Sequence, residues 1–207
     1  MVTDGKFIGH NALVTGISNP IGFTIAKLLV SEGCLLHIAD YDEQVLKNCF
    51  DNFKGLYNVD TEIHQMDLSE PINISVLALE CQDANIVINT MGTTKKGGIN
   101  QLDHEDWKND FELNLLTAIN LTGEILDSVY EQENGIIINV GGTVDGIDVE
   151  NICTISINAA LQAFSETLDK KTKIDGPRIL YFLPQANIST EKNADTLNHL
   201  ISEKLFP

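Results

Sequence analysis

Short strand-like runs alternate with helix-period segments along the whole chain. Most of the runs are rich in Val, Ile and Leu, which is typical of strands that are covered on both faces. They lie at Asn11–Thr15, Leu35–Ala39, Glu62–Met66, Ile86–Thr90, Gly135–Val140 and Arg178–Leu183. Helical spacing of apolar residues predicts helices at Pro20–Glu32, Gln44–Phe53, Ile74–Cys81, Glu105–Glu131, Ile152–Lys171 and Glu191–Lys204. This order predicts an α/β fold with a doubly wound, six-stranded parallel sheet.

The chain is predicted to form one domain over residues 1–207, because it contains no internal repeat and no low-complexity linker. The segment Met1–His10 lacks the apolar core of a signal peptide. No apolar run is long enough to span a bilayer. The sequence therefore predicts a cytoplasmic protein without a membrane partner.

Charge and the scattered Cys and His residues exclude several partner classes. The chain has 30 acidic and 13 basic residues and a formal net charge of -17, so nucleic acid is a poor partner. The cysteines, which form no CxxC pair, are expected to be reduced and to pack as small apolar residues; they are Cys34, Cys49, Cys81 and Cys153. The five histidines are equally scattered in the sequence, and no metal site is predicted.

A glycine-bearing loop follows the first predicted strand and precedes the first predicted helix. It contains Gly16, Ser18, Ile21 and Gly22. In such a loop, backbone N–H groups and the helix dipole can bind a pyrophosphate. Asp40 ends the second strand, where a carboxylate can accept a hydrogen bond from a ribose 2′-OH.

These and later residues resemble the short-chain dehydrogenase/reductase family. The family's glycine motif, Thr-Gly-x-x-x-Gly-x-Gly, matches residues 15–22 except that Pro20 stands at its middle glycine. Further matches occur in the family's order at Asp67-Leu68, Asn89–Gly92, Asn114, Ile137–Val140, Pro184 and Thr190. The resemblance implies a Rossmann-type fold and a cofactor site for NAD. It places that site at Gly16, Ser18, Ile21, Gly22, Asp40, Asp67, Leu68 and Asn89.

The family's catalytic positions have changed. The family uses a Tyr as general acid/base, a Lys four residues later, a Ser that binds the substrate oxygen, and an Asn. Here the Ser position falls at Gly141 or Gly142, the Tyr position at Thr154 and the Lys position at Asn158, while Asn114 retains the Asn. A register shifted by one, with Ile155 and Ala159, also lacks Tyr and Lys. Since losing a positioned general acid/base costs ~10²–10⁴-fold in rate, the chain is predicted to perform no hydride transfer alone.

Two further departures weaken the expected cofactor and substrate sites. Pro20 has no N–H to offer a pyrophosphate, although Asn19 as N-cap and Pro20 as first residue also describe an ordinary helix start. We therefore expect NAD binding by this chain to be weak or absent. Family members continue beyond the position of Thr190 with a substrate-covering loop and helix and a seventh strand. The resemblance thus implies a truncated C-terminus, with Arg178–Leu183 as a sheet edge that the last helix or another subunit must cover.

The helices at about 105–131 and 152–171 carry more apolar residues than a sheet can cover, which predicts an interface. The partner implied by the resemblance is an active paralogue. One such family arrangement is the two-subunit NAD-dependent dehydrogenase that oxidises 2-(α-hydroxybenzyl)succinyl-CoA in anaerobic aromatic degradation, and this chain is similar to its degenerate subunit type. Two alternatives are a module that senses NAD(H) without turnover, and an enzyme with rewired chemistry that uses Thr143, Asp145 or Thr154.

Overall fold

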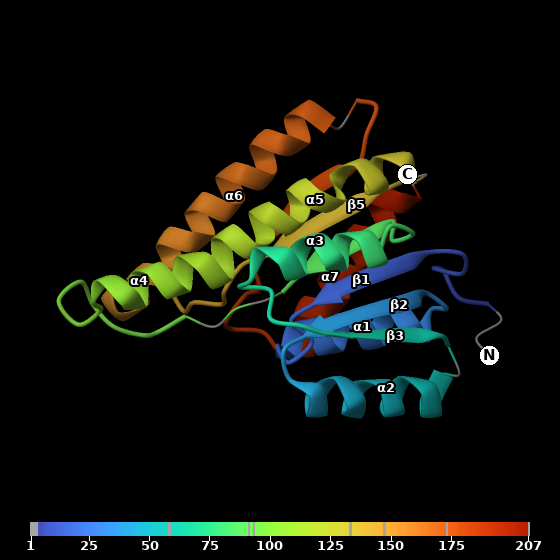
Figure 1. Ribbon diagram of the computed structural model, residues 1–207, viewed down its shortest axis with the longest axis horizontal. Coiled ribbons are helices and arrows are strands. Elements are labelled where there is room, and N and C mark those ends of the chain that lie inside the picture. The colour runs from blue at the N-terminus through green and yellow to red at the C-terminus, as the bar shows by residue number, and fades with distance from the viewer. Residues whose placement is uncertain are drawn as a thin grey trace.

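A computed structural model of the chain describes residues 4–57, 59–90, 92, 94–132, 134–146, 148–172 and 174–206. Met91, within the predicted Asn89–Gly92 motif, lies outside the described residues. The described chain forms one parallel sheet with helices on both faces (Figure 1). Its strands are β1 (Asn11–Thr15), β2 (Leu35–Asp40), β3 (Thr61–Gln65), β4 (Ile86–Asn89), β5 (Ile136–Val140) and β6 (Arg178–Phe182).

The strand order is β3-β2-β1-β4-β5-β6, and every neighbouring pair is parallel. This is the order of a doubly wound Rossmann-type sheet, which confirms the predicted fold class. The order reverses between β1 and β4. In sheets of this kind, ligands bind at that switch point, beyond the carboxyl ends of the strands.

Six of the seven α-helices in the described chain divide between the two faces of the sheet. One face carries α1 (Pro20–Ser31), α2 (Glu43–Tyr57) and α7 (Thr190–Leu205), and the other carries α3 (Pro71–Glu80), α5 (Thr117–Glu131) and α6 (Ile152–Thr172) (Figure 1). Helix α4 (His104–Phe111) extends from the start of α5 beyond the sheet. A 3₁₀ turn, Val149–Asn151, leads into α6. Each face has its own apolar core, so both faces are buried as predicted.

The predicted long helix over Glu105–Glu131 is interrupted by a π-helical turn at Glu112–Leu116. Asn114 lies in the middle of this turn, and its side-chain amide donates to the carbonyl oxygen of Asp110 at 2.9 Å. Periodicity could not predict the interruption, because the apolar residues continue on both sides of it. Single π turns within helices are frequent at functional sites.

The last helix covers a face of the sheet rather than its edge. Helix α7 packs against α1, and Leu197, Ile201 and Leu205 enter the core that Leu180 and Phe182 of β6 reach. Among the described residues, β6 has a strand neighbour on one side only. The expected sheet edge is therefore present, but α7 does not cover it. No described helix is both long and apolar enough to cross a membrane.

Candidate active site

A cleft of about 590 Å³ opens at the carboxyl ends of β1, β2 and β4, at the switch point of the sheet. Its described lining residues are Gly16, Ser18, Asn19, Pro20, Asp40, Tyr41, Asp67, Ser69, Thr90, Gly92, Asn109, Glu112 and Leu113. A second pocket of about 450 Å³ shares the residues Asn19, Pro20, Thr90 and Gly92 with it. The two cavities therefore adjoin, as a nucleotide cleft and a reaction pocket would.

Glycine is required at both ends of the loop after β1. Gly16 has a φ of +68°, in the left-handed region that favours glycine. A Cβ at Gly22 would lie 2.4 Å from the hydroxyl oxygen of Thr90 and 2.6 Å from the carbonyl oxygen of Gly16. Gly22 thus allows α1 to approach β4 closely, and it lines neither cavity.

The backbone donors of Ser18, Asn19 and Ile21 are already engaged within the chain. The N–H of Ser18 donates to Oδ2 of Asp40 at 2.9 Å, and that of Asn19 donates within the turn at 2.9 Å. The N–H of Ile21 donates to Oδ1 of Asn19 at 2.9 Å, and Pro20 has no N–H. Four consecutive positions therefore present no uncommitted donor to a pyrophosphate. The Asn19 carboxamide caps α1 at the place where an anion would otherwise accept the hydrogen bond.

The walls of this cleft are acidic. Asp40 is buried, and its second carboxylate oxygen accepts from the N–H of Asp42 at 3.1 Å. Asp67 and Glu112 add two more carboxylates, and no Lys, Arg or His is among the described lining residues. A bound pyrophosphate would meet repulsion here and no countercharge.

Three predicted cofactor positions have structural partners instead. The Asp67 carboxylate lines the cleft but accepts from the N–H and hydroxyl of Ser69, at 2.9 and 2.7 Å. The Leu68 side chain is fully buried in the core. Asn89 is buried and donates to Oδ1 of Asn139 at 2.8 Å. Of the eight predicted positions, Gly16, Ser18, Asp40 and Asp67 line the cleft, Ile21 lines the adjoining pocket, and Gly22, Leu68 and Asn89 line neither.

The adjoining pocket contains the family's catalytic positions, and its described lining includes no titratable side chain. Its described lining residues are Asn19, Pro20, Ile21, Thr90, Gly92, Thr94, Asn114, Val140, Gly141, Gly142, Thr143, Thr154, Ile157, Asn158, Leu161, Gln185, Ala186, Ile188, Thr190 and Asn193. None of them is acidic, basic, a thiol or a phenol. Every polar group in this lining is an amide, a hydroxyl or the backbone.

The predicted catalytic positions are close together and bonded to their neighbours. Asn158 accepts from the N–H of Gly142 at 2.9 Å and donates to its carbonyl oxygen at 2.8 Å. The hydroxyl of Thr154 is hydrogen-bonded to that of Thr94. A Cβ on Gly142 would lie 2.7 Å from Cγ2 of Thr154, so the space for a serine is taken. These residues stabilise the loop after β5 and offer no proton donor of suitable acidity.

Tyr181 of β6 supplies a phenol close to the predicted catalytic positions, but its hydroxyl has no hydrogen-bond partner among the described residues. A Cβ on Gly141 would lie 2.3 Å from the Tyr181 hydroxyl oxygen, so this hydroxyl lies against the loop after β5. The hydroxyl is also buried. Burial raises the pKa of Tyr181 to about 12. With no base or cation to activate it, this phenol stays protonated at neutral pH.

The remaining candidates divide between the pocket and the surface. Asn114 lines both the pocket and a small internal cavity, and a Cβ on Gly92 would lie 1.7 Å from its Oδ1. Thr143 lines the pocket. Asp145 is exposed and does not line it, so the structure does not bring together the three residues suggested for rewired chemistry.

Sequence reasoning missed several lining residues. The hydroxyl of Thr90 donates to the carbonyl oxygen of Thr15 at 2.6 Å, which ties β4 to β1 beneath the cleft. Gln185 and Asn193 exchange two hydrogen bonds, of 2.8 and 3.0 Å, between the loop after β6 and α7. Thr90 lies within the matched Asn89–Gly92 motif, but sequence reasoning assigned it no role of its own. The Gln185–Asn193 pair could not have been found from the sequence, because both residues are common in loops and helix starts.

Comparison with known proteins places most of the chain in one family. A family model described as short chain dehydrogenase matches residues 10–196. The nodulation protein G of Rhizobium meliloti is 28% identical over 97% of this chain and 82% of its own length. The 3-oxoacyl-acyl-carrier-protein reductase of Salmonella typhimurium is 28% identical over 83% of this chain and 70% of its own length. An uncharacterized oxidoreductase of Staphylococcus saprophyticus is 26% identical over 89% of this chain and 81% of its own length.

Solved structures show the same fold at lower identity. A metagenomic short-chain oxidoreductase in complex with NADP has a TM-score of 0.87 and 20% identity, covering 98% of this chain and 95% of that one. A short chain dehydrogenase from Mycobacterium smegmatis has a TM-score of 0.87 and 19% identity, covering 98% and 91%. L-Sorbose reductase from Gluconobacter frateurii, complexed with NADPH and L-sorbose, has a TM-score of 0.86 and 20% identity, covering 99% and 93%. At these identities the likeness concerns the fold.

Proposed function

We propose, on the premise that this chain belongs to the short-chain dehydrogenase family, that it is a non-catalytic subunit which assembles with an active NAD-dependent paralogue. In this arrangement the partner supplies the Tyr, Lys and Ser of the family's chemistry and a complete cofactor loop. This chain supplies a folded scaffold and an interface. The proposal concerns the role of this chain, and the family membership does not depend on it.

The absence of a titratable group from the described lining of the 450 Å³ pocket is the observation that carries the proposal. Alcohol oxidation needs a group that takes the hydroxyl proton as the hydride leaves, and carbonyl reduction needs the reverse. The amides and hydroxyls of the pocket have no base beside them. Asn158 is held by two hydrogen bonds to the Gly142 backbone, so it is not available to orient a ribose.

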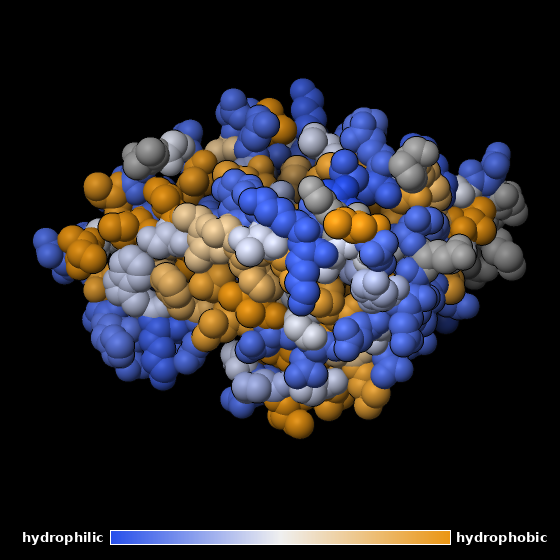
Figure 2. Space-filling model, turned by 90° about the horizontal axis from the view of Figure 1, so that it is seen from above, coloured by the Kyte–Doolittle hydropathy of each residue, from blue (hydrophilic) through white to orange (hydrophobic). Residues whose placement is uncertain are grey.

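Partly exposed apolar side chains on α4, the π turn, α5 and α6 support the partner. Leu116 is 44% exposed. Trp107, Phe111, Ile119, Ile152, Ala160 and Phe164 pack around a buried cluster but remain partly accessible. Figure 2 shows apolar side chains gathered over this face, toward the end of the molecule where α4 lies in Figure 1. A surface of this kind suits a second subunit of the same family that presents matching helices.

The partner's reaction follows from the family arrangement that pairs a degenerate with a competent subunit. We propose the NAD-dependent oxidation of an alcohol such as a hydroxyacyl-CoA, carried out in the partner's pocket. Any NAD bound by this chain would be held weakly, because its loop donors are committed and its cleft is acidic.

The test is to purify the chain alone and together with full-length homologues of the same genome that carry an intact Tyr-x-x-x-Lys. We expect no turnover by the chain alone, and a defined complex whose activity exceeds that of the partner alone. An Ile119→Glu variant in α5 should abolish the complex and leave the fold intact. A Thr24→Glu variant in α1, on the opposite face, serves as the control and should assemble normally. Turnover by the isolated chain, or a stable monomer that binds none of these homologues, would refute the proposal.

A second candidate function is a nucleotide-binding module without turnover, and the buried Asp40 beside Gly16 at the switch point favours it. A carboxylate at this place can accept from a ribose 2′-OH, and it disfavours a 2′-phosphate. Calorimetric titration with NAD⁺ and NADH distinguishes the two candidates. Heat and a thermal shift at micromolar NADH would support the module, and their absence at millimolar cofactor would eliminate it.

A further inference from the structure

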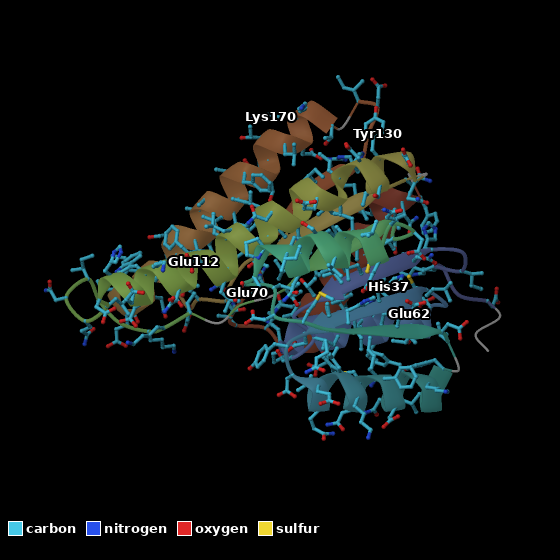
Figure 3. The ribbon with its side chains drawn as sticks, in the orientation of Figure 1. His37, Glu62, Glu70, Glu112, Tyr130 and Lys170 are labelled. Carbon is cyan, nitrogen blue, oxygen red and sulfur yellow. The ribbon has the colours of Figure 1, made fainter. Side chains whose placement is uncertain are left out.

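Two histidines and a cysteine that are distant in the sequence meet beside the edge strand of the sheet. His37 lies on β2, His64 on β3, and Cys81 directly follows α3. In the parallel register, His37 stands opposite Glu62 and Ala39 stands opposite His64, so the two histidines face the same side of the sheet. Figure 3 shows His37 and Glu62 close together on the sheet beneath α3. The histidines are scattered in the sequence, but these two are neighbours in space.

The ligand atoms of this cluster lie at the spacing of a metal site. Nδ1 of His37 is 3.1 Å from Nε2 of His64, and Sγ of Cys81 is 3.7 Å from the same Nε2. The three atoms all lie within 4.8 Å of one another. A tetrahedral zinc with bonds of about 2.05 Å to nitrogen and 2.3 Å to sulfur separates its ligand atoms by about 3.3–3.6 Å. Small side-chain adjustments would therefore bring all three atoms to one ion.

The outer ring nitrogens of both histidines face carboxylates. Nε2 of His37 is 3.1 Å from Oδ1 of Asp83, and Nδ1 of His64 is 2.9 Å from Oε2 of Glu80. A carboxylate accepts hydrogen bonds, so each of these outer nitrogens carries the proton. Metal-bound histidines are commonly oriented in this way, with the free N–H donated to a carboxylate.

When both rings are neutral, this arrangement leaves no proton on the two nitrogens that face each other, Nδ1 of His37 and Nε2 of His64. The lone pairs of these two nitrogens then face each other at 3.1 Å, and the side chains of His37 and His64 are 8% and 6% exposed. Such a contact is unfavourable unless a cation lies between the rings. The cation is either an additional proton, shared by the two rings, or a metal ion. In the first case the thiol of Cys81 makes only a long contact of 3.7 Å with Nε2 of His64, and in the second case it is a ligand.

A candidate fourth ligand lies beside the cluster on its solvent side. Oε2 of Glu62 lies 3.7 Å from Nδ1 of His37, and its side chain is 71% exposed. The carboxylate can therefore move onto an ion from the solvent side. With Glu62, Asp83 and Glu80, the cluster has negative charge around it, which favours a divalent cation over an empty cavity.

We propose that His37, His64, Cys81 and Glu62 form a structural zinc site that ties the edge strand β3 to β2 and to the end of α3. Zinc suits this mixed set of imidazole, thiolate and carboxylate in a four-coordinate arrangement. His37 lies three positions before Asp40, and none of the four residues lines either cavity of the candidate active site. The site is independent of the proposed function.

Binding of the ion requires the Cys81 thiol to lose its proton to solvent as the sulfur–zinc bond forms. Without a cation, burial and the neighbouring carboxylates of Asp83, Glu80 and Glu62 raise the pKa of this thiol. A divalent ion at the cluster reverses that balance, because it stabilises the thiolate directly. The same ion also replaces any proton that the two imidazoles share.

Cobalt(II) is the probe, because thiolate ligation gives it a charge-transfer band in the near ultraviolet and tetrahedral geometry gives it strong visible bands. We expect the metal-free full-length chain to bind one cobalt per molecule with both signatures, and zinc to displace it. Cys81→Ser should remove the charge-transfer band. Cys49→Ser, a buried cysteine on the other face of the sheet, should leave it unchanged. Asp83→Asn should weaken zinc binding by about 10–100-fold, the usual effect of removing a carboxylate behind a metal-bound histidine.

A measurement on the unmodified chain tests the proposal even if a variant does not fold. A thermal unfolding scan of the unmodified chain with and without zinc should show a rise in the unfolding temperature that chelation reverses. No cobalt uptake at a hundredfold excess would overturn the proposal and leave the shared proton as the cation. Uptake without a thiolate band, or uptake retained in folded His64→Gln, would also overturn it, because the ion would then lie elsewhere on the acidic surface. None of these three results would bear on hydride transfer or on partner binding.

Discussion

Freeing one backbone donor in the loop after β1 should strengthen nucleotide binding while it weakens the fold. In Asn19→Gly and Asn19→Ala, Oδ1 of Asn19 no longer accepts from the N–H of Ile21. That N–H then points from the start of α1 without a partner and is available to a pyrophosphate oxygen. A hydrogen bond to a charged group contributes about 1.5–3 kcal/mol, so NADH affinity should rise by about 10- to 150-fold.

The same two variants should differ in stability. Replacing an Asn N-cap by Ala costs about 0.5–2 kcal/mol, whereas Gly costs a few tenths. In a chain of this size, 1 kcal/mol lowers the unfolding temperature by about 2–4 °C. Asn19→Gly should therefore gain affinity at almost no cost, and Asn19→Ala should gain similar affinity with a measurable loss.

Calorimetric titration and thermal unfolding measure the two effects separately. Ser189→Ala is the matched control, because Ser189 caps α7 and lines neither cavity. It should lower the unfolding temperature and leave NADH affinity unchanged. If Asn19→Ala loses stability as expected but neither Asn19 variant binds NADH better, the committed donors are not what limits nucleotide binding, and the reasoning is refuted.

Three further predictions test packing and titration. Gly22→Ala should lower the urea midpoint strongly, because its Cβ would lie 2.4 Å from the hydroxyl oxygen of Thr90. Its control, Gly55→Ala in α2, has open space around the added Cβ and should raise stability by about 0.5–1 kcal/mol. Equal effects of the two variants would contradict the close approach of α1 to β4. Gly142→Ser should lower folding stability by about 1–3 kcal/mol through overpacking. Adding Thr154→Ser removes the methyl group 2.7 Å from the new Cβ and should recover most of that stability. Strict additivity of the two changes in a double-mutant cycle would disprove the contact. The pKa of the Tyr181 phenol is about 10 in the unfolded chain and about 12 in the folded one, so the stability of the protein should fall as pH rises from 10 to about 12. Tyr181→Phe should flatten this fall. An unchanged profile of the urea midpoint against pH would show that the phenol is not buried.

The fold was predictable because the periodicity of this chain is regular. The run Ile86–Asn89 lies between a helix and a long loop, and its short length and apolar residues favour a buried strand over a helix. The structure has a strand there with all four residues buried. Asn19 and Pro20 are typical of a helix start, and α1 begins at Pro20. The π turn at Glu112–Leu116 was not predictable, because it changes the hydrogen bonding of the backbone without interrupting the apolar pattern.

The candidate site was predictable in its location but not in its contacts. The sequence places Thr154 and Asn158 at the family's Tyr and Lys positions, and both line the pocket. Asn158 holds the Gly142 backbone by two hydrogen bonds. These bonds depend on how closely α6 approaches β5, and the spacing of residues in the sequence does not show that distance. The motif match assigned Leu68 to the cofactor site, and the spacing alone did not indicate that its side chain lies in the core.

The histidine–cysteine cluster required the three-dimensional register. His37 and His64 are 27 residues apart, and they meet because β2 and β3 pair with Ala39 opposite His64. A shift of one residue in that pairing would turn His64 to the other face of the sheet. A sequence without close His and Cys spacing gives no sign of such a site.

The proposed non-catalytic role requires that the pocket of this chain cannot move a proton. The most direct measurement is the rate at which the isolated chain, at micromolar concentration and with saturating NAD⁺ or NADH, oxidises a panel of alcohols or reduces a panel of carbonyls. The account predicts no rate above that of the cofactor in buffer. A kcat of about 1 s⁻¹ or more, within the ordinary range of enzymes, would contradict it.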